Sequence, residues 1–178
     1  QDGYVWVWAA PDVEPDTEPF RLPAVETGYS SVRRVVEAPS TLHAAVENAL
    51  DVPHTAFLHR GLFRGSGKRN VITARVTRTA TSVTAEYIGE PRPEGLAGKI
   101  LSPSGGIVVH FDRFILPSVA QVEYRLGAEN HFLVTSIATP VEDFVTRLYA
   151  FVLFRTRFPG WLVKLILSSP DILILDEP

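Results

Sequence analysis

Runs of apolar, aromatic and β-branched residues recur along the chain, with turn-forming residues between them. Such runs are typical of β-strands. A short aromatic run at residues 4–8 predicts one strand, and two further runs form a hairpin around Thr79-Ala80-Thr81. The other runs predict most of a sheet. Together with the hairpin they place strands at residues 29–36, 71–77, 83–88, 107–116, 119–126, 131–139 and 144–155.

Two segments carry the signals of a helix start. Ser40 or Thr41 can cap a helix that begins near Leu42 and continues toward residue 59. Pro159-Gly160 starts a final helix with an apolar sequence. Residues 91–106, with proline and glycine at both ends, predict a loop.

The order of these elements predicts an α+β fold. A helix, a run of strands and a last helix give an antiparallel sheet that is covered on one face by helices. A curved sheet of this kind leaves room for an interior pocket, where small molecules usually bind. Residues 11–23 are rich in proline and acids and predict a solvated linker.

Composition narrows the function classes. The chain has 178 residues with 46% hydrophobic and 21% charged residues, which fits one domain with a sizeable core. A net charge of −3 gives no reason to expect a nucleic acid partner. The absence of cysteine excludes disulfides, cysteine nucleophiles and iron–sulfur ligation by these residues.

No secretory signal opens the sequence, which does not begin with Met, so we expect residues upstream to be missing. The apolar region 148–175 is interrupted by charges and by Pro159-Gly160, and it contains no window of about 20 apolar residues. We therefore expect no transmembrane span and a cytoplasmic location.

The segment 47–59 carries the candidate chemistry. It contains Asn48, Asp51, His54 and His59, and imidazole is the commonest protein ligand of redox metals. Asn48, Asp51 and His54 follow one another at intervals of three, so on a helix they lie on neighbouring faces. The two histidines are five residues apart, which on a regular helix turns them about 140° away from each other. Pro53 favours a bend that lets them converge.

Two histidines need a third ligand to form a site. Iron(II) oxygenases use two histidines and one carboxylate and leave other positions open. Asp171, flanked by Ile-Leu-Ile-Leu, is costly to bury unless it is paired, and metal ligation is one way to resolve that cost. Helix N-capping by Asp171 is the alternative, and Asp176 and Glu177 are alternative carboxylates.

The run from Asn48 to His59 resembles the iron-binding motif of Rieske non-haem iron oxygenases, in which Asn-x-x-Asp-x-x-His is followed four or five residues later by His. Residues 2–8 look like the strand that closes the Rieske domain of that family. Residues 170–175 look like its C-terminal segment, whose Asp completes the ligand set, although Pro170 replaces the polar residue often found there. The resemblance implies residues 1–24 as that closing strand plus a linker, and residues 25–178 as a helix-grip catalytic domain wrapped around a C-terminal helix.

The resemblance also implies roles. His54, His59 and Asp171 would bind a mononuclear iron(II). Asp51 would couple this iron to a [2Fe-2S] Rieske cluster of a neighbouring subunit, and Asn48 would lie near the iron. Such enzymes use O2 to hydroxylate or demethylate apolar, ring-containing substrates. They are commonly trimers and receive electrons from NAD(P)H through a separate reductase or ferredoxin.

The missing cysteines are a departure from the family, because a Rieske cluster needs two Cys and two His. The chain thus resembles the catalytic part alone, which we expect to be inactive without its Rieske domain. The alternative is a non-catalytic helix-grip domain that binds a lipid or another apolar molecule.

Three further histidines and one aromatic stripe have other expected roles. His43 is expected at the surface or in a structural role, and His131 at the surface. His110 lies on a strand that can line the pocket, where it either contacts substrate or fills a satisfied core position. The aromatic stripe is expected in the core and comprises Phe144, Tyr149, Phe151 and Phe154.

Overall fold

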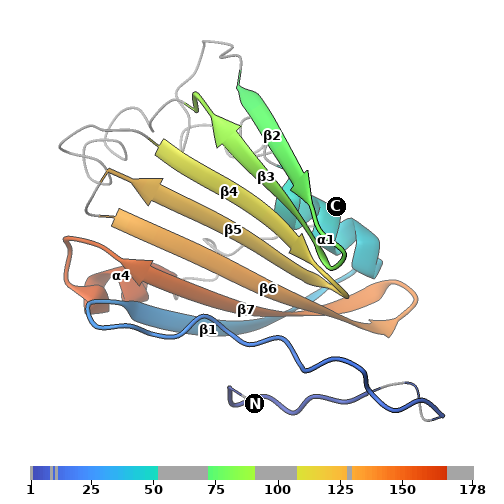
Figure 1. Ribbon diagram of the computed structural model, residues 1–178. Coiled ribbons are helices and arrows are strands. Elements are labelled where there is room, and N and C mark those ends of the chain that lie inside the picture. The colour runs from blue at the N-terminus through green and yellow to red at the C-terminus, as the bar shows by residue number, and fades with distance from the viewer. Residues whose placement is uncertain are drawn as a thin grey trace.

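One antiparallel sheet of seven strands dominates the computed structural model (Figure 1). The structure describes residues 2–8, 10, 12–51, 72–90, 108–127 and 130–167, with the backbone alone at residues 162 and 165–167. The strand order is β1-β7-β6-β5-β4-β3-β2, and every neighbouring pair is antiparallel. The strands are β1 Ser30–Ala38, β2 Thr73–Arg78, β3 Ser82–Ile88, β4 Val108–Ile115, β5 Val119–Leu126, β6 Asn130–Glu142 and β7 Val145–Arg155.

The strand order explains where the first helix lies. β1 pairs with β7 along its whole length and lies at one edge of the sheet, whereas β2 lies at the other edge. The connection between them therefore crosses the sheet, and helix α1 (Leu42–Leu50) belongs to this crossing. α1 lies against one face of the sheet, as Figure 1 shows.

Both ends of α1 have identifiable caps. The Ala44 N–H donates to Thr41 Oγ1 at 3.3 Å, so Thr41 is the N-cap among the two candidates. At the other end the Asp51 N–H donates to the Asn48 carbonyl at 3.4 Å, and the helix ends at Leu50. The sequence predicted a helix that continues toward His59, but residues 52–71 lie outside the described part of the chain.

The packing of α1 forms the main apolar cluster of the described residues. Ala45 and Val46 of the helix are buried against Ala120, Ala138 and Leu148 of the sheet. Because three of these five side chains are alanines, the helix backbone approaches the strands closely. Partly buried hydrophobic side chains surround this contact, namely Ala38, Leu42, Ala49, Leu50 and Phe114.

The second described helix, α4 (Gly160–Leu167), follows β7 and contacts β1. Gly160 stands at the close approach: a Cβ added there would lie 2.6 Å from Ser30 Oγ. Whether the sheet wraps around a longer C-terminal helix, as the helix-grip expectation has it, stays a prediction.

Side-chain alternation gives the sheet two different faces. On β4, Val108, His110, Asp112 and Phe114 point to the face that carries α1, since Phe114 belongs to the α1 cluster. The opposite face of the sheet carries the intervening side chains of each strand. The α1 face therefore combines the helix that carries Asn48 and Asp51 with the buried polar side chains of β4.

The mostly antiparallel sheet with a helix on one face confirms the α+β expectation at this level, with strand bounds close to those predicted. Two expectations from the sequence were wrong. Residues 4–8 pair with no strand in the described ranges, so no strand forms there. Phe144 was expected in the core but is 71% exposed, because it lies in the β6–β7 turn, whereas Phe151 and Phe154 are buried as predicted.

The α1 contact predicts a large effect of Leu148→Ala. Leu148 is 2% exposed at the centre of the cluster, so its truncation leaves a cavity and should lower the free energy of unfolding by about 3 kcal/mol. The exposed Phe144→Ala is the control and should change it by less than about 0.5 kcal/mol. Urea denaturation of both variants measures the difference, and equal losses would contradict this account of the core.

Candidate functional site

Only part of the predicted iron motif lies in the described chain. Asn48 sits in the last turn of α1 and Asp51 caps its C-terminal end. His54, His59 and Asp171, the three predicted metal ligands, lie outside the described residues, as do Asp176 and Glu177. Within the described ranges no group of three or more His, Asp or Glu side chains is arranged to hold a metal ion. The predicted ligand set therefore stays a prediction.

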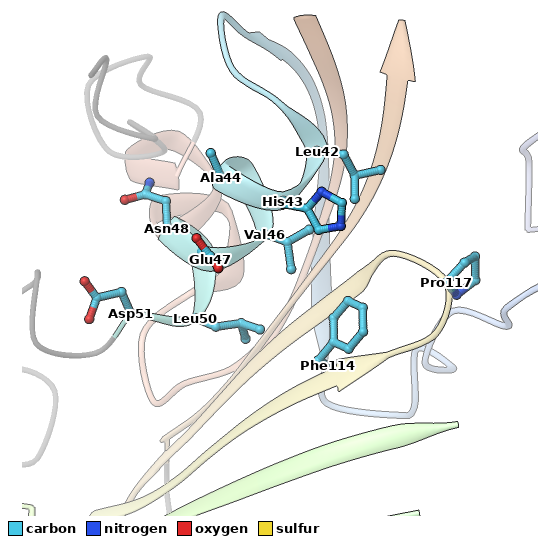
Figure 2. A pocket seen from close by; sticks show the side chains of 10 residues that line it. All are labelled: Leu42, His43, Ala44, Val46, Glu47, Asn48, Leu50, Asp51, Phe114 and Pro117. Atoms are coloured by element: carbon cyan, nitrogen blue, oxygen red, sulfur yellow. The ribbon is translucent and has the colours of Figure 1, made fainter. Parts of the chain in front are cut away.

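A pocket of about 780 Å³ lies between α1 and the β4–β5 hairpin. Figure 2 shows Phe114 and Pro117 on the hairpin side and the α1 side chains opposite them, with Asn48 and Asp51 at the end away from Pro117. Leu42, Val46 and Leu50 give the helix side an apolar wall. The described lining consists of Leu42, His43, Ala44, Val46, Glu47, Asn48, Leu50, Asp51, Phe114 and Pro117.

His43 is exposed at the edge of this pocket, in agreement with its expected surface position. The pocket thus combines apolar walls with a polar end formed by the last turn of α1. Volumes of this size accommodate drug-sized organic molecules.

A buried polar network lies on the same face of the sheet. His110 is fully buried, with Nδ1 2.6 Å from Glu90 Oε2 and Nε2 2.9 Å from Asp112 Oδ1. Carboxylates accept hydrogen bonds, so this geometry favours donation from both ring nitrogens, which is the imidazolium form of His110. We refer to Glu90, His110 and Asp112 as the His110 network.

Two tyrosine rings enclose the imidazole. Tyr87 of β3 and Tyr124 of β5 stack on it, with ring centroids at 4.6 and 4.0 Å. This follows from the strand register, which pairs His110 with both tyrosines. Of the two expected roles for His110, the structure shows a core position satisfied by hydrogen bonds.

The network shifts two pKa values. Burial opposes a charge on His110, but the hydrogen bonds to Asp112 and Glu90 outweigh it and hold the His110 pKa above its ordinary value. Burial first, and then the neighbouring Asp112 carboxylate, raises the pKa of Tyr87 to about 12. The charge of Asp51 contributes to the Tyr87 shift, so the network lies near the Asp51 end of the pocket.

The sequence pattern did not point to Glu90, Asp112, Tyr87 or Tyr124 as members of a site. One signal was available: His110 and Asp112 are two residues apart on a predicted strand and so point to the same face. Glu90 follows the end of β3 at Ile88, and its approach to His110 depends on the pairing of β3 with β4, which no spacing in the sequence reveals.

A second charged cluster lies on the opposite face of the sheet. Glu123 pairs with Arg113 at 2.7 Å, with Arg125 at 2.7 Å and with His131 at 3.1 Å. His131 was expected at the surface, but its side chain is only 14% exposed. The Tyr29 hydroxyl, 2.7 Å from Nδ1, covers it together with Glu123. Burial and the nearby arginines lower the pKa of His131.

The comparisons with known proteins fit this geometry. Residues 38–164 match the model of the vanillate O-demethylase oxygenase C-terminal domain. The match covers more than half of the chain, and the chain belongs to this family of Rieske oxygenase catalytic domains, as its motif indicated. No curated protein matches the sequence significantly.

Several solved structures share the fold. Dicamba monooxygenase bound to dicamba superposes with a TM-score of 0.70 at 15% identity, over 89% of this chain and 50% of that chain. NdmA of Pseudomonas putida CBB5 with caffeine gives a TM-score of 0.61 at 17% identity, over 91% and 50%. The quaternary ammonium Rieske monooxygenase CntA gives 0.52 at 15% identity, over 82% and 35%. These identities establish the fold alone, and the chain spans half or less of each of these proteins.

None of the described helices is long and apolar enough to cross a bilayer.

The raised pKa of His110 predicts a pH dependence of stability. The folded chain holds a proton that the unfolded chain releases, so this contribution is complete below about pH 6.5 and is lost as the pH rises through the folded-state pKa. Above about pH 6.5, His110→Gln should remove a decline of up to about 1.4 kcal/mol per pH unit from the free energy of unfolding. Urea denaturation across this range measures it.

His131→Gln is the control of opposite sign. Because the pKa of His131 is lowered, its contribution is present above about pH 6.5 and is lost as the pH falls below that value. Equal pH slopes for the wild type and His110→Gln above about pH 6.5 would contradict an imidazolium in the His110 network.

Proposed function

We propose that this chain is the catalytic part of a Rieske-type oxygenase that carries a mononuclear iron(II) and uses O2 to hydroxylate or oxidatively demethylate an apolar, ring-containing substrate. One observation carries the proposal: in a chain of this family, the α1 turn with Asn48 and Asp51 forms the polar end of an apolar-walled pocket. Dicamba and caffeine in two structurally similar proteins support a ring-containing substrate.

The proposed ligands are His54, His59 and Asp171. Two imidazoles and one carboxylate, with the remaining positions open, suit iron(II) in oxygenases. The described end of α1 fits a cation nearby, because the carbonyls at a helix C-terminus carry partial negative charge and Glu47 and Asp51 add two carboxylates. Iron bound there would supply the redox chemistry that O2 activation needs.

Asp51 and Asn48 have separate proposed roles. Asp51 stands between the end of α1 and the segment with His54, where its carboxylate can hold a proton and join the iron site to a Rieske cluster of another subunit. Asn48, on the same side of the helix, can orient a ligand through its amide. The resemblance of the motif supports both assignments.

The electron supply completes the proposal. The chain has no cysteine, so we place the [2Fe-2S] cluster in a Rieske domain upstream, with residues 1–24 as the segment that links it to the catalytic domain of residues 25–178. A reductase or ferredoxin would deliver electrons from NAD(P)H. A homotrimer would bring the cluster of one subunit to the iron of the next. Without that cluster we expect no turnover.

Iron content tests the ligand set. Protein purified under reducing conditions and loaded with iron(II) should retain about one iron per chain, and His54→Ala should lose it. His43→Ala, in an exposed pocket residue of the same type, should leave the iron content unchanged. Plasma emission spectrometry gives the stoichiometry.

The rival function would show itself in the same experiment. If wild type and His54→Ala are both free of iron and still bind an apolar probe, the chain is a non-catalytic domain for apolar ligands. The apolar wall of the pocket is the observation that supports this alternative function.

The role of Asp51 gives a separate prediction. In the full-length protein supplied with its electron donor, Asp51→Asn should retain iron but lower substrate oxidation by at least about 100-fold, because the amide cannot transfer a proton. Asp143→Asn changes an exposed acid outside the pocket, in the β6–β7 turn, and should alter the rate by less than about threefold. Loss of iron in Asp51→Asn would instead make Asp51 a ligand.

A further inference from the structure

A small polar pocket of about 140 Å³ lies at the end of the sheet away from the β4–β5 hairpin. Figure 1 shows the ends of β5 and β7 and the start of β6 together on that side. The pocket shares no lining residue with the pocket beside α1, so it is separate from the proposed substrate pocket. Its described lining consists of Tyr29, Arg125, Gly127, Asn130, His131 and Arg155.

Strand register places two of these residues, both arginines, on either side of a histidine. His131 of β6 pairs with Arg125 of β5 and with Arg155 of β7. The three residues form one row across neighbouring strands, and we call it the basic row. Because neighbouring strands lie about 4.8 Å apart, the Cα atoms of the two arginines are roughly 10 Å apart. Side chains of paired residues point to the same face, so one ligand in the pocket can contact both guanidiniums.

The histidine between the arginines is neutral. Its Nε2 donates to Glu123 Oε1 at 3.1 Å, and its Nδ1 accepts from the Tyr29 hydroxyl at 2.7 Å. Burial first, and then Arg125 and Arg155, lower the pKa of His131 against the opposing effect of Glu123. The imidazole therefore adds no charge to the basic row at neutral pH.

Positive charge around the pocket exceeds negative charge among the described residues. Glu123 pairs with Arg113 and Arg125, both at 2.7 Å. Arg155 makes no ion pair within the described part of the chain, where its contact is with an aromatic ring. Three guanidiniums and one carboxylate leave two positive charges, on a chain whose net charge is −3. Like charges on one row repel each other, and an anion between them relieves that repulsion.

Both guanidiniums are held in place by neighbouring side chains. Arg125 donates through Nε and Nη2 to Glu123 Oε1, at 2.8 and 2.7 Å, which leaves Nη1 without a partner among the described residues. The guanidinium carbon of Arg155 lies 5.1 Å from the centroid of the Tyr29 ring. Stacking engages the face of a guanidinium and leaves the N–H donors in its plane available. Side chains that are fixed in this way lose little conformational entropy when they bind an anion.

We propose that the basic row binds one phosphate-class dianion, either free phosphate or the phosphate group of a small monoester. Arg125 and Arg155 donate to its oxygens, since the planar fork of a guanidinium suits phosphate. Two positive charges match a dianion, and a pocket of about 140 Å³ has room for one group of this size. A carboxylate would compensate one of the two charges. This inference does not depend on the proposed function, because the two pockets share no lining residue.

Calorimetric titration of the full-length protein tests the site with inorganic phosphate, phenyl phosphate and acetate. At about pH 8 phosphomonoesters are dianions, and potassium chloride keeps the ionic strength constant so that screening does not vary. We expect one site per chain, with both phosphates at least about tenfold tighter than acetate. Binding of inorganic phosphate alone would identify the free ion as the ligand, and binding of both phosphates would extend the ligands to monoesters.

Arg155→Gln should weaken phosphate binding by at least about tenfold, because it removes the guanidinium that has no acid partner in the described chain. Arg147→Gln is the matched control and should leave the affinity unchanged. Arg147 lies on the same strand and the same face, pairs with Glu37 and does not line the pocket. Circular dichroism checks that the variants are folded, and Arg125→Gln decides if Arg155→Gln is not.

Three results would overturn the inference: no saturable phosphate binding up to about 20 mM, an acetate affinity equal to that of phosphate, or wild-type phosphate affinity in the charge-loss variant. Equal affinity for acetate would instead indicate a contact for an acidic side chain of a partner protein. The iron content of the same samples tests the proposed function separately. Phosphate binding in a protein without iron refutes the oxygenase alone, and iron without phosphate binding refutes this inference alone.

Discussion

The packing of α1 on the sheet is the constraint on which the rest of the site depends. Ala45 and Val46 are buried against small side chains of β5 and β6 and against Leu148 of β7. This contact fixes both the position of the helix and its rotation about its own axis. Because Asn48 and Asp51 belong to the same helix, their direction is set by the burial of its apolar side. The pocket is the space left between this helix and the β4–β5 hairpin.

The interior of the sheet is unusual in holding a charged network beside an apolar pocket. Burial of an imidazolium is unfavourable, and His110 is stable there because a carboxylate accepts from each ring nitrogen. Two stacked tyrosines exclude solvent from it. A network held this tightly gives a carboxylate a defined direction.

The buried charges on the two faces of the sheet are compensated in different ways. On the opposite face, Glu123 collects two arginines and a histidine, and each of its partners lies near solvent or a tyrosine. Glu123 is thus fully compensated, and burial raises its pKa less than the arginines lower it. On the α1 face, positive charge in the network comes from His110 alone. The two faces therefore differ in how far their buried negative charge is compensated by positive side chains.

The sequence by itself determined the family, the strand bounds to within a few residues and a helix start near Leu42, because local signals fix them: turn residues, β-branched runs and a side-chain oxygen before a helix. It left Ser40 and Thr41 as alternative caps, and the structure shows that Thr41 is the cap. It also named Asn48 and Asp51 from spacing, and the structure shows them together at the end of α1. Other features needed the tertiary structure. The meeting of Glu90, His110 and Asp112, the burial of His131 and the exposure of Phe144 depend on strand register and on which segments cover each face. No single segment encodes them, because register joins residues that are far apart in the chain.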